Sequence, residues 1–152
     1  PKADAGAQAA FKKNFRSIAA ETLPEHAKKK PLEVWLQDEA RVGQQGTVTR
    51  IWARRGTRPR APRDTRYKWS YIFGAACPAR GMAAGLILPR VDAEAMSLHL
   101  QEIAKTVATG AHALLIMDGA GWHQAKSLDV PENITLLKLP AYAPELNPME
   151  NV

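Results

Sequence analysis

Three carboxylates occupy positions in this sequence where metal-dependent chemistry is feasible. Asp38 follows a short β-prone stretch, Asp118 follows a continuous apolar run, and Glu150 comes three residues after Asn147. Carboxylates that are brought together repel each other, so a cluster of three is stable only if cations neutralise it. Hard oxygen ligands favour Mg²⁺ or Mn²⁺. Two such ions, about 3.5–4 Å apart, can activate a water or a 3′-hydroxyl and stabilise the leaving oxygen of a phosphodiester.

Each acid also has an explanation that involves no metal. Asp38 could be an ordinary acid at a strand end, and Asp118 could form an Asx turn at a tight corner. Glu150 occupies the capping-box position relative to Asn147, so helix capping accounts for it. His123 could be a polar surface residue, a donor beside the site or a DNA contact. The three acids are therefore candidates for catalysis and metal binding, with His123 as a site-adjacent residue.

A second candidate surface is a strongly basic segment over residues 41–68. It holds nine basic residues and a single acid, Asp64, which is a net charge of +8 in a chain whose total is +6. The segment could simply be a solvated face, but so many like charges repel each other without an anionic partner. We therefore expect it to contact DNA phosphates rather than to read bases. Its basic residues are Arg41, Arg50, Arg54, Arg55, Arg58, Arg60, Arg63, Arg66 and Lys68.

Hydrophobic periodicity predicts the helices that support these groups. Apolar residues at helical spacing predict a helix over residues 5–22, followed by a basic linker. A second helix is expected from Asp92, as its N-cap, to about residue 109. Asn147 can cap a third helix that begins at Pro148. The apolar face of the second helix consists of Met96, Leu100, Ile103 and Val107.

Short apolar stretches predict the strands, of which two end directly before Asp38 and Asp118. If the first strand continues beyond Asp38, Glu39 points to the opposite face and is not a ligand. A turn with Gly and Pro predicts that two of the strands form an antiparallel hairpin. The order strand, hairpin, helix, strand, strand suits an α/β domain with a mixed central sheet flanked by helices. The expected strands cover residues 33–37, 47–53, 67–76, 82–88, 113–117 and 134–139.

The bulk composition favours a single globular domain in the cytoplasm. Of the 152 residues, 45% are hydrophobic and 24% are charged, and no stretch is apolar for long enough to span a membrane. The N-terminus lacks the layout of a signal peptide. Cys77 is the only cysteine, so we expect a small buried residue and no internal disulfide. Because nucleotide-binding, metalloprotease and hydrolase motifs are absent, the acid triad has no rival.

Three longer stretches carry a family resemblance. They are WLQDEARVGQQG at residues 35–46, LLIMDGAGWHQAK at residues 114–126 and LPAYAPELNPMENV at residues 139–152. Together they resemble the DDE catalytic domain of bacterial insertion-sequence transposases of the six-thirty group, which is related to the mariner superfamily. The resemblance implies a ribonuclease H-like fold. It also implies that Asp38, Asp118 and Glu150 are the catalytic metal ligands, holding two Mg²⁺ or Mn²⁺ ions.

The same resemblance implies an enzyme of DNA transposition. Such an enzyme cuts transposon ends by metal-assisted hydrolysis and joins the new 3′-hydroxyl to target DNA, as a homodimer at full length and in the nucleoid of the bacterial cytoplasm. Residues 1–30 are then a connector helix with a basic linker, and residues 31–152 are the catalytic domain, truncated at its C-terminus. The alternatives are a different ribonuclease H-like nuclease and a catalytically decayed DNA-binding fragment.

Two departures from the family pattern affect what we expect of this chain. Gly119 stands where many relatives have asparagine, so an outer-shell hydrogen bond must come from another group. The family's N-terminal helix-turn-helix region is absent, and the helix expected at Pro148 is cut off two residues after Glu150. Short helices persist only with tertiary support. We therefore expect the chain to fold but to have little transposase activity by itself.

Overall fold

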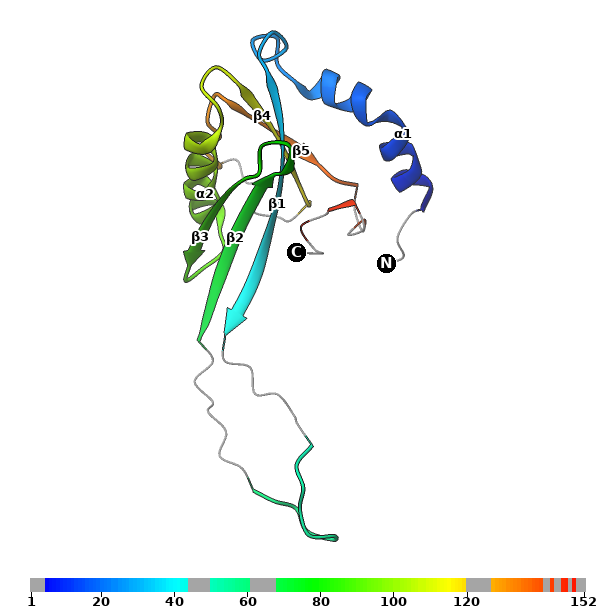
Figure 1. Cartoon of the computed structure of the whole chain (residues 1–152), viewed down its shortest axis with the longest axis vertical. Helices are drawn as coiled ribbons and strands as arrows, with labels where there is room; N and C mark the ends of the chain where they lie inside the picture. Colours follow the sequence, from blue (N-terminus) through cyan, green and yellow to red (C-terminus); the bar gives the residue numbers. More distant parts are fainter. Residues whose placement is uncertain are drawn as a thin grey trace.

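The computed structural model describes residues 5–43, 50–60, 68–119 and 127–140, together with Ala143, Leu146, Asn147 and Met149. The described elements are α1 (Ala5–Thr22), β1 (Leu32–Gly43), β2 (Trp69–Cys77), the short 3₁₀ helix η1 (Pro78–Arg80), β3 (Met82–Leu88), α2 (Ala93–Thr106), β4 (His112–Met117) and β5 (Ile134–Lys138). The strands form one sheet in the order β3-β2-β1-β4-β5 (Figure 1). The expected α/β architecture is confirmed.

The sheet is mixed, as the order of elements predicted. β1, β4 and β5 are parallel, whereas β2 runs antiparallel to both β1 and β3. The predicted hairpin is the β2–β3 pair, joined through η1 and Gly81. Gly81 has a φ of 61°, a left-handed conformation that glycine adopts without steric cost. The hairpin therefore forms where Gly and Pro indicated a turn.

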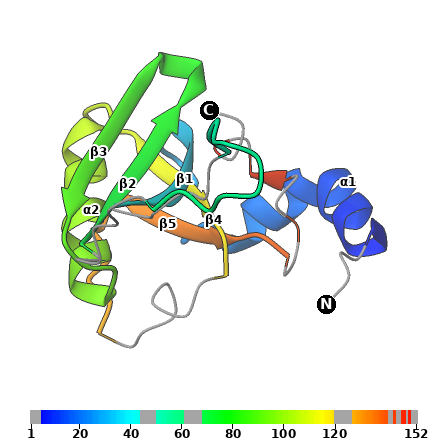
Figure 2. The same ribbon diagram turned by 90° about the horizontal axis from the view of Figure 1, so that it is seen from below.

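The two helices cover opposite faces of the sheet. Successive side chains of a strand point to opposite faces, so Trp35 and Leu115 enter one core while Leu36 and Ile116 enter the other. The first core contains the buried face of α2, and the second contains the apolar residues of α1. Figure 2 shows α1 alongside β5. Because both faces are covered at β4, all six of its residues are buried.

The α2 helix forms as its sequence predicts. The carboxylate of Asp92 accepts a hydrogen bond of 2.8 Å from the backbone N–H of Ala95, which caps the helix. The helix ends at Thr106 rather than near residue 109, because Val107 has a ψ of 138° and leaves the helical conformation. The four residues of the expected apolar face are all buried, as are Cys77 and Ala95.

The strand boundaries differ from expectation in the first half of the chain. β1 was expected to end at residue 37 but continues to Gly43, because its antiparallel ladder with β2 extends to the pair Gly43 and Trp69. The extended piece expected over residues 47–53 is not a strand over its described part, residues 50–53. Residues 44–49 lie outside the described part of the chain. β2 begins at Trp69, two residues later than expected.

A buried carboxylate anchors the start of β1. Glu33 accepts hydrogen bonds from Trp35 Nε1 at 2.9 Å, Arg80 Nη1 at 3.1 Å and the backbone N–H of Ala108 at 3.1 Å. Burial by itself raises the pKa of Glu33, but these three donors and the charge of Arg80 outweigh it and lower the pKa. Glu33 therefore has a structural role that connects β1, η1 and the end of α2.

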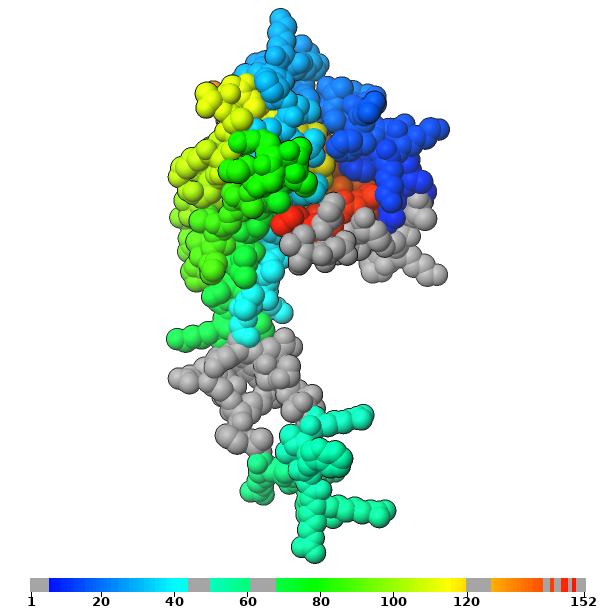
Figure 3. Space-filling model, in the orientation of Figure 1, coloured from blue at the N-terminus to red at the C-terminus, as the bar shows by residue number. Residues whose placement is uncertain are grey.

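Residues 50–60 lie beyond the ends of β1 and β2, away from the sheet (Figure 3). Their side chains are all exposed. Within the described residues, no helix is long and apolar enough to cross a membrane.

Candidate active site

The first two acids of the predicted triad belong to neighbouring strands, because Asp38 lies within β1 and Asp118 directly follows β4. β1 pairs with β4 from Leu32 to Leu36, and the last pair of this ladder is Leu36 with Ile116. Asp38 and Asp118 each stand two residues beyond that pair. Neighbouring strands are about 4.8 Å apart, so this register brings the two acids to the same level at the end of the parallel ladder.

Asp38 belongs to the face of the sheet that α1 covers in part, and Asp118 follows the end of β4. Leu36 and Ile116 pack in the core beneath α1, and residues two positions apart on a strand share a face. Asp38 is half-buried and Asp118 is exposed. Asp118 follows β4 directly, as expected, whereas Asp38 was expected at the end of a strand and lies inside β1. The reason is that β2 keeps β1 extended after β4 has ended.

The neighbours of Asp38 occupy the opposite face of the sheet. The backbone N–H of Glu39 donates a hydrogen bond of 2.9 Å to Asp38 Oδ1. The side chain of Glu39 accepts one of 3.0 Å from Gln37 Nε2, and its charge acts on His99 of α2. Alternation along the strand thus directs Glu39 towards α2 and Asp38 towards the other face, which is the arrangement expected if β1 continues.

His99 is a buried titratable residue that the sequence pattern did not single out. Its side chain is fully buried on α2, and its ring centroid lies 5.7 Å from that of Phe73. Burial lowers the pKa of His99 to about 4, although the charge of Glu39 and the backbone of Gly74 act in the opposite direction. At neutral pH this imidazole is therefore uncharged. The only sign of its burial in the sequence is that His99 stands between Leu98 and Leu100 in the stretch that is predicted to be a helix.

Asn147 connects the C-terminal segment to β1 beside Asp38. Its Nδ2 donates a hydrogen bond of 3.1 Å to the backbone oxygen of Gln37, and its Oδ1 accepts one of 3.3 Å from the backbone N–H of Met149. The residue is only 2% exposed. The bond from Met149 is of the kind that a capping asparagine makes, but the helix expected from Pro148 lies outside the described residues. The bond to Gln37 is a second contact that the sequence did not indicate.

Met149 packs on the sheet next to the same acid. Its Cε lies 3.5 Å from the position of a Cβ built on Gly74, the residue of β2 that pairs with Asp38. A side chain at Gly74 would therefore meet Met149 at van der Waals distance. Asp38 and Gly74 are directly opposite each other in the ladder. Met149 therefore packs on the sheet beside the strand position of Asp38.

Glu150 and His123 lie outside the described residues. Among the residues that are described, no three His, Cys, Asp or Glu side chains form a group that could hold a metal ion. Two of the three expected ligands, Asp38 and Asp118, are thus placed by the structure, and the third follows Met149 in the chain. The donors that are in place are carboxylate oxygens, which suit Mg²⁺ or Mn²⁺.

The described basic residues of the expected DNA surface fall into two groups, one at the strands β1 and β2 and one in residues 50–60. Arg41 lies within β1, with its guanidinium 4.3 Å from the ring centroid of Trp69 in a cation–π contact. Lys68 is exposed one residue before β2. Arg63 and Arg66 lie outside the described residues. The exposed arginines away from the sheet are Arg50, Arg54, Arg55, Arg58 and Arg60.

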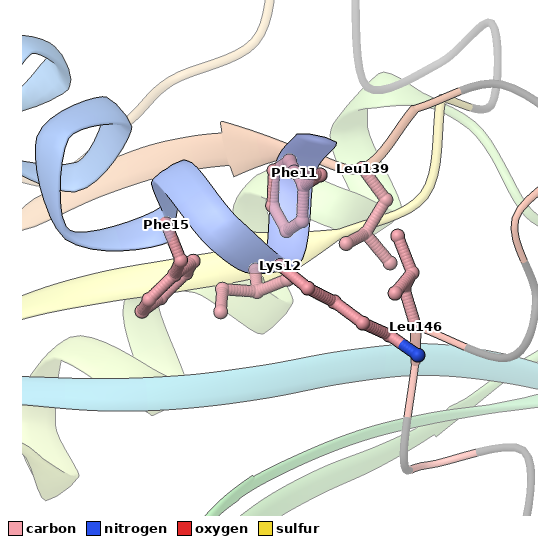
Figure 4. A pocket seen from close by; sticks show the side chains of 6 residues that line it. Phe11, Lys12, Phe15, Leu139 and Leu146 are labelled. Carbon is pink, nitrogen blue, oxygen red and sulfur yellow. The ribbon is translucent and has the colours of Figure 1, made fainter. Parts of the chain in front are cut away.

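A pocket of about 330 Å³ lies between α1 and the sheet, on the same face as Asp38. Figure 4 shows Phe11, Lys12 and Phe15 of α1 opposite Leu139 and Leu146. Ile116 completes the lining, and Lys12 is the only residue of the six that can carry a charge. An apolar lining with a cation cannot provide oxygen ligands. This pocket is therefore not the metal site.

A comparison with known families identifies the chain. The family model described as DDE superfamily endonuclease matches residues 33–152. This range covers most of the chain and includes Asp38 and Asp118. The chain belongs to the DDE superfamily endonucleases. The resemblance that the three sequence stretches indicated is confirmed.

A close relative of this DDE endonuclease chain is the uncharacterized protein y4pE/y4sA of Sinorhizobium fredii. The two are 61% identical over 84 residues, which is 55% of this chain and 62% of the relative. The name of the relative describes no activity.

Solved structures that resemble this DDE endonuclease are complexes of Mos1 transposase. The Mos1 paired-end complex with left transposon end has a TM-score of 0.59 at 14% identity. The Mos1 mariner paired end complex with Mn has a TM-score of 0.60 at 15% identity. The alignments cover 99% and 97% of this chain but 47% of each Mos1 chain. The expected ribonuclease H-like fold is confirmed, and the chain spans less than half the length of these neighbours.

Proposed function

We propose that this chain is the catalytic domain of a DNA transposase, and that its parent protein cuts transposon ends and transfers them to target DNA. The observation that carries the proposal is the register of β1 and β4, whose last pair, Leu36 and Ile116, stands two residues before Asp38 and Asp118. Carboxyl ends of neighbouring parallel strands are where α/β domains assemble their sites. The family and the fold of the Mos1 complexes support the same chemistry.

Glu150 is the proposed third ligand, and its neighbours in the chain support this role. Asn147 donates to β1 one residue before Asp38, and Met149 packs over Gly74, which pairs with Asp38. These contacts bring the residue before Glu150 close to the strand that carries Asp38. The alternative role, helix capping alone, requires no such contact between the C-terminal segment and β1.

The three carboxylates fit a pair of divalent cations by the chemistry of their oxygens. Asp38 and Asp118 would hold one ion together, and Glu150 would complete the site of the second. Mg²⁺ or Mn²⁺ bound there would supply activation of a water or 3′-hydroxyl and stabilisation of the leaving oxygen. The Mos1 structure described with Mn supports manganese as the probe. Asp38 is held in place by the hydrogen bond from its neighbour Glu39, which fixes the direction of one carboxylate oxygen.

DNA is the proposed substrate, and the exposed arginines of residues 50–60 are its proposed phosphate contacts. DNA at transposon ends and at the target presents a dense row of negative charge to which guanidinium groups bind in a salt-dependent manner. Three further expectations stay predictions: the homodimer, the location in the bacterial nucleoid, and the bounds of the catalytic domain at residues 31–152.

Calorimetry with Mn²⁺ tests the metal site in the 152-residue chain. We expect Asp38→Asn and Asp118→Asn each to weaken binding by at least about tenfold, because each removes a charged ligand. Asp129→Asn is the matched control, since Asp129 is an exposed acid away from the site. Unchanged isotherms in both site variants would refute the proposed site.

The parent protein at full length tests the reaction. On a plasmid that carries its transposon ends, we expect metal-dependent cleavage that is lost in Asp38→Asn, Asp118→Asn and Glu150→Gln and retained in Asp129→Asn. Chelation of the metal should stop cleavage reversibly. Metal binding without any cleavage by the wild-type parent would instead favour a decayed DNA-binding protein.

A further inference from the structure

A tryptophan stands in solvent among the arginines of residues 50–60. Trp52 is 104% exposed, which means that the whole indole is accessible, and its neighbour Ile51 is 55% exposed. The segment carries five arginines and no acid, and all of its described side chains are exposed (Figure 3). The segment is therefore strongly cationic, and it also exposes two apolar side chains, those of Ile51 and Trp52.

The tip of this segment has a defined turn. The backbone N–H and the hydroxyl of Thr57 both donate to the carbonyl oxygen of Arg54, at 3.1 Å and 2.6 Å. Gly56 has a φ of 80°, which allows the chain to reverse without strain. Trp52 stands two residues before this turn, so arginines flank the indole along the chain on both sides.

The other two described tryptophans are in contact with protein groups. Trp35 is buried and donates its N–H to Glu33, and Trp69 lies beneath the guanidinium of Arg41. An indole combines a large apolar face with a polar N–H, which is why tryptophan is enriched at interfaces. Trp52 therefore has a different role from the two tryptophans of the sheet.

We propose that Trp52 stacks on a DNA base, at a step where the duplex is unstacked or easily unstacked, while the surrounding arginines hold the adjacent phosphates. This inference rests on the proposed function and adds a contact to the bases of its DNA. The charge of the segment decides the class of partner, because five cations without an acid complement a polyanion. Every base offers an aromatic face, so stacking recognises base exposure and not a particular sequence. Apolar side chains that insert between base steps act on DNA in the same way.

The test measures DNA affinity against salt by fluorescence anisotropy, on an intact duplex and on the same duplex with a central mismatch. We expect Trp52→Ala to weaken binding to the mismatched duplex by about 5- to 100-fold at every salt concentration. The slope of log K against log salt should stay unchanged, because no phosphate contact is lost. Trp52→Phe should retain most of the affinity, since a ring remains to stack.

Two neighbouring variants serve as controls. Ile51→Ala removes an exposed apolar side chain next to Trp52 and should change affinity by less than about twofold, because no π-face is lost. Arg54→Ala should lower the salt slope by about 0.9. We expect all variants to unfold at the same temperature, because these side chains are exposed and do not contribute to the core. Equal unfolding temperatures would show that the fold is intact.

The outcomes separate this inference from the proposed function. If Arg54→Ala lowers the slope and Trp52→Ala changes nothing, the segment binds phosphates alone and the stacking role of Trp52 is wrong. If neither variant changes DNA binding while metal-dependent cleavage persists, the segment is not a DNA surface. If Trp52→Ala turns a dimer into a monomer in sedimentation without changing DNA affinity, the partner of the indole is a second copy of the chain, which also overturns the inference.

Discussion

A single amide, that of Asn147, connects two parts of the proposed active site. One end of the side chain accepts from Met149 and the other donates to the Gln37 carbonyl, one residue before Asp38. An aspartate at this position has the same shape and keeps the acceptor, but it has no N–H to donate. The two contacts can therefore be separated by one substitution.

We predict that Asn147→Asp weakens binding of the ion that depends on Glu150 by about 10- to 100-fold, the usual cost of losing an outer hydrogen bond at a metal site. The matched control is Asn133→Asp, because Asn133 Nδ2 also donates to a backbone oxygen, that of Ala104, at 3.0 Å. Calorimetry with Mn²⁺ measures both variants. If the control weakens metal binding as much as Asn147→Asp does, the effect is one of general stability and not of position.

His99 makes the stability of the fold depend on pH. Its pKa in the folded chain, about 4, lies below the ordinary value of 6.5, so the unfolded chain binds the proton more tightly. The neutral imidazole therefore contributes fully to stability above about pH 6.5, and this contribution is lost as the pH falls towards 4. Glu39 and Glu102 face the ring and oppose the shift, but burial has the larger effect.

We predict that the wild-type chain loses about 2 kcal/mol more free energy of unfolding between pH 7 and pH 5 than His99→Leu, which cannot titrate there. Urea unfolding at the two pH values measures this difference. Since His99→Leu alters packing as well, only the change with pH is compared, not the absolute stability. Parallel pH dependence of the two chains would show that His99 is not responsible.

At the scale of elements, α2 is the clearest example of a helix that is stabilised by one face. Leu100 is fully buried against the sheet, whereas Leu98, two residues earlier, is 45% exposed. The two positions belong to the same helix and carry the same side chain. They therefore differ in burial but not in intrinsic helix propensity.

We predict that Leu100→Ala lowers the free energy of unfolding by about 2–5 kcal/mol, because it leaves a cavity in the core. Leu98→Ala should change it by at most about 0.5 kcal/mol. Chemical denaturation measures both values in the same buffer. Similar losses in the two variants would contradict the assignment of the buried face.

At the scale of the molecule, positive charge and acid site are segregated. The arginines of residues 50–60 lie beyond one end of β1 and β2, and the two described acids lie at the level where β4 ends. Cations placed at a distance from the acids can bind DNA phosphates without neutralising the carboxylates of the proposed metal site.

We predict that replacing Arg54, Arg55 and Arg58 by Ala lowers the slope of log K against log salt by up to about three units, since each phosphate contact contributes about 0.9. The control replaces Lys12, Lys13 and Arg16 of α1, which are also exposed, and removes the same charge. Its slope should change less. Equal slopes for the two triple variants would show that only net charge matters.

Local signals were sufficient for much of this fold. The continuous apolar run of β4, the apolar face of α2 with its Asp92 cap, and the Gly and Pro turn of the β2–β3 hairpin each depend on residues close together in the chain. Such patterns express burial and backbone preference directly, so the sequence by itself predicted these elements. The position of Asp118 after β4 followed from the same local pattern.

Contacts between distant residues decided the rest. β1 continues through Asp38 only because β2, some thirty residues later, supplies a ladder up to Gly43. Asn147 reaches Gln37 across 110 residues, and the pKa of His99 depends on the sheet that buries it. Pairing and burial of this kind depend on which surfaces meet in three dimensions, and local periodicity does not encode that choice. The sequence therefore determined which acids are candidates, and the tertiary structure decided that Asp38 and Asp118 each stand two residues beyond the last pair of the β1–β4 ladder.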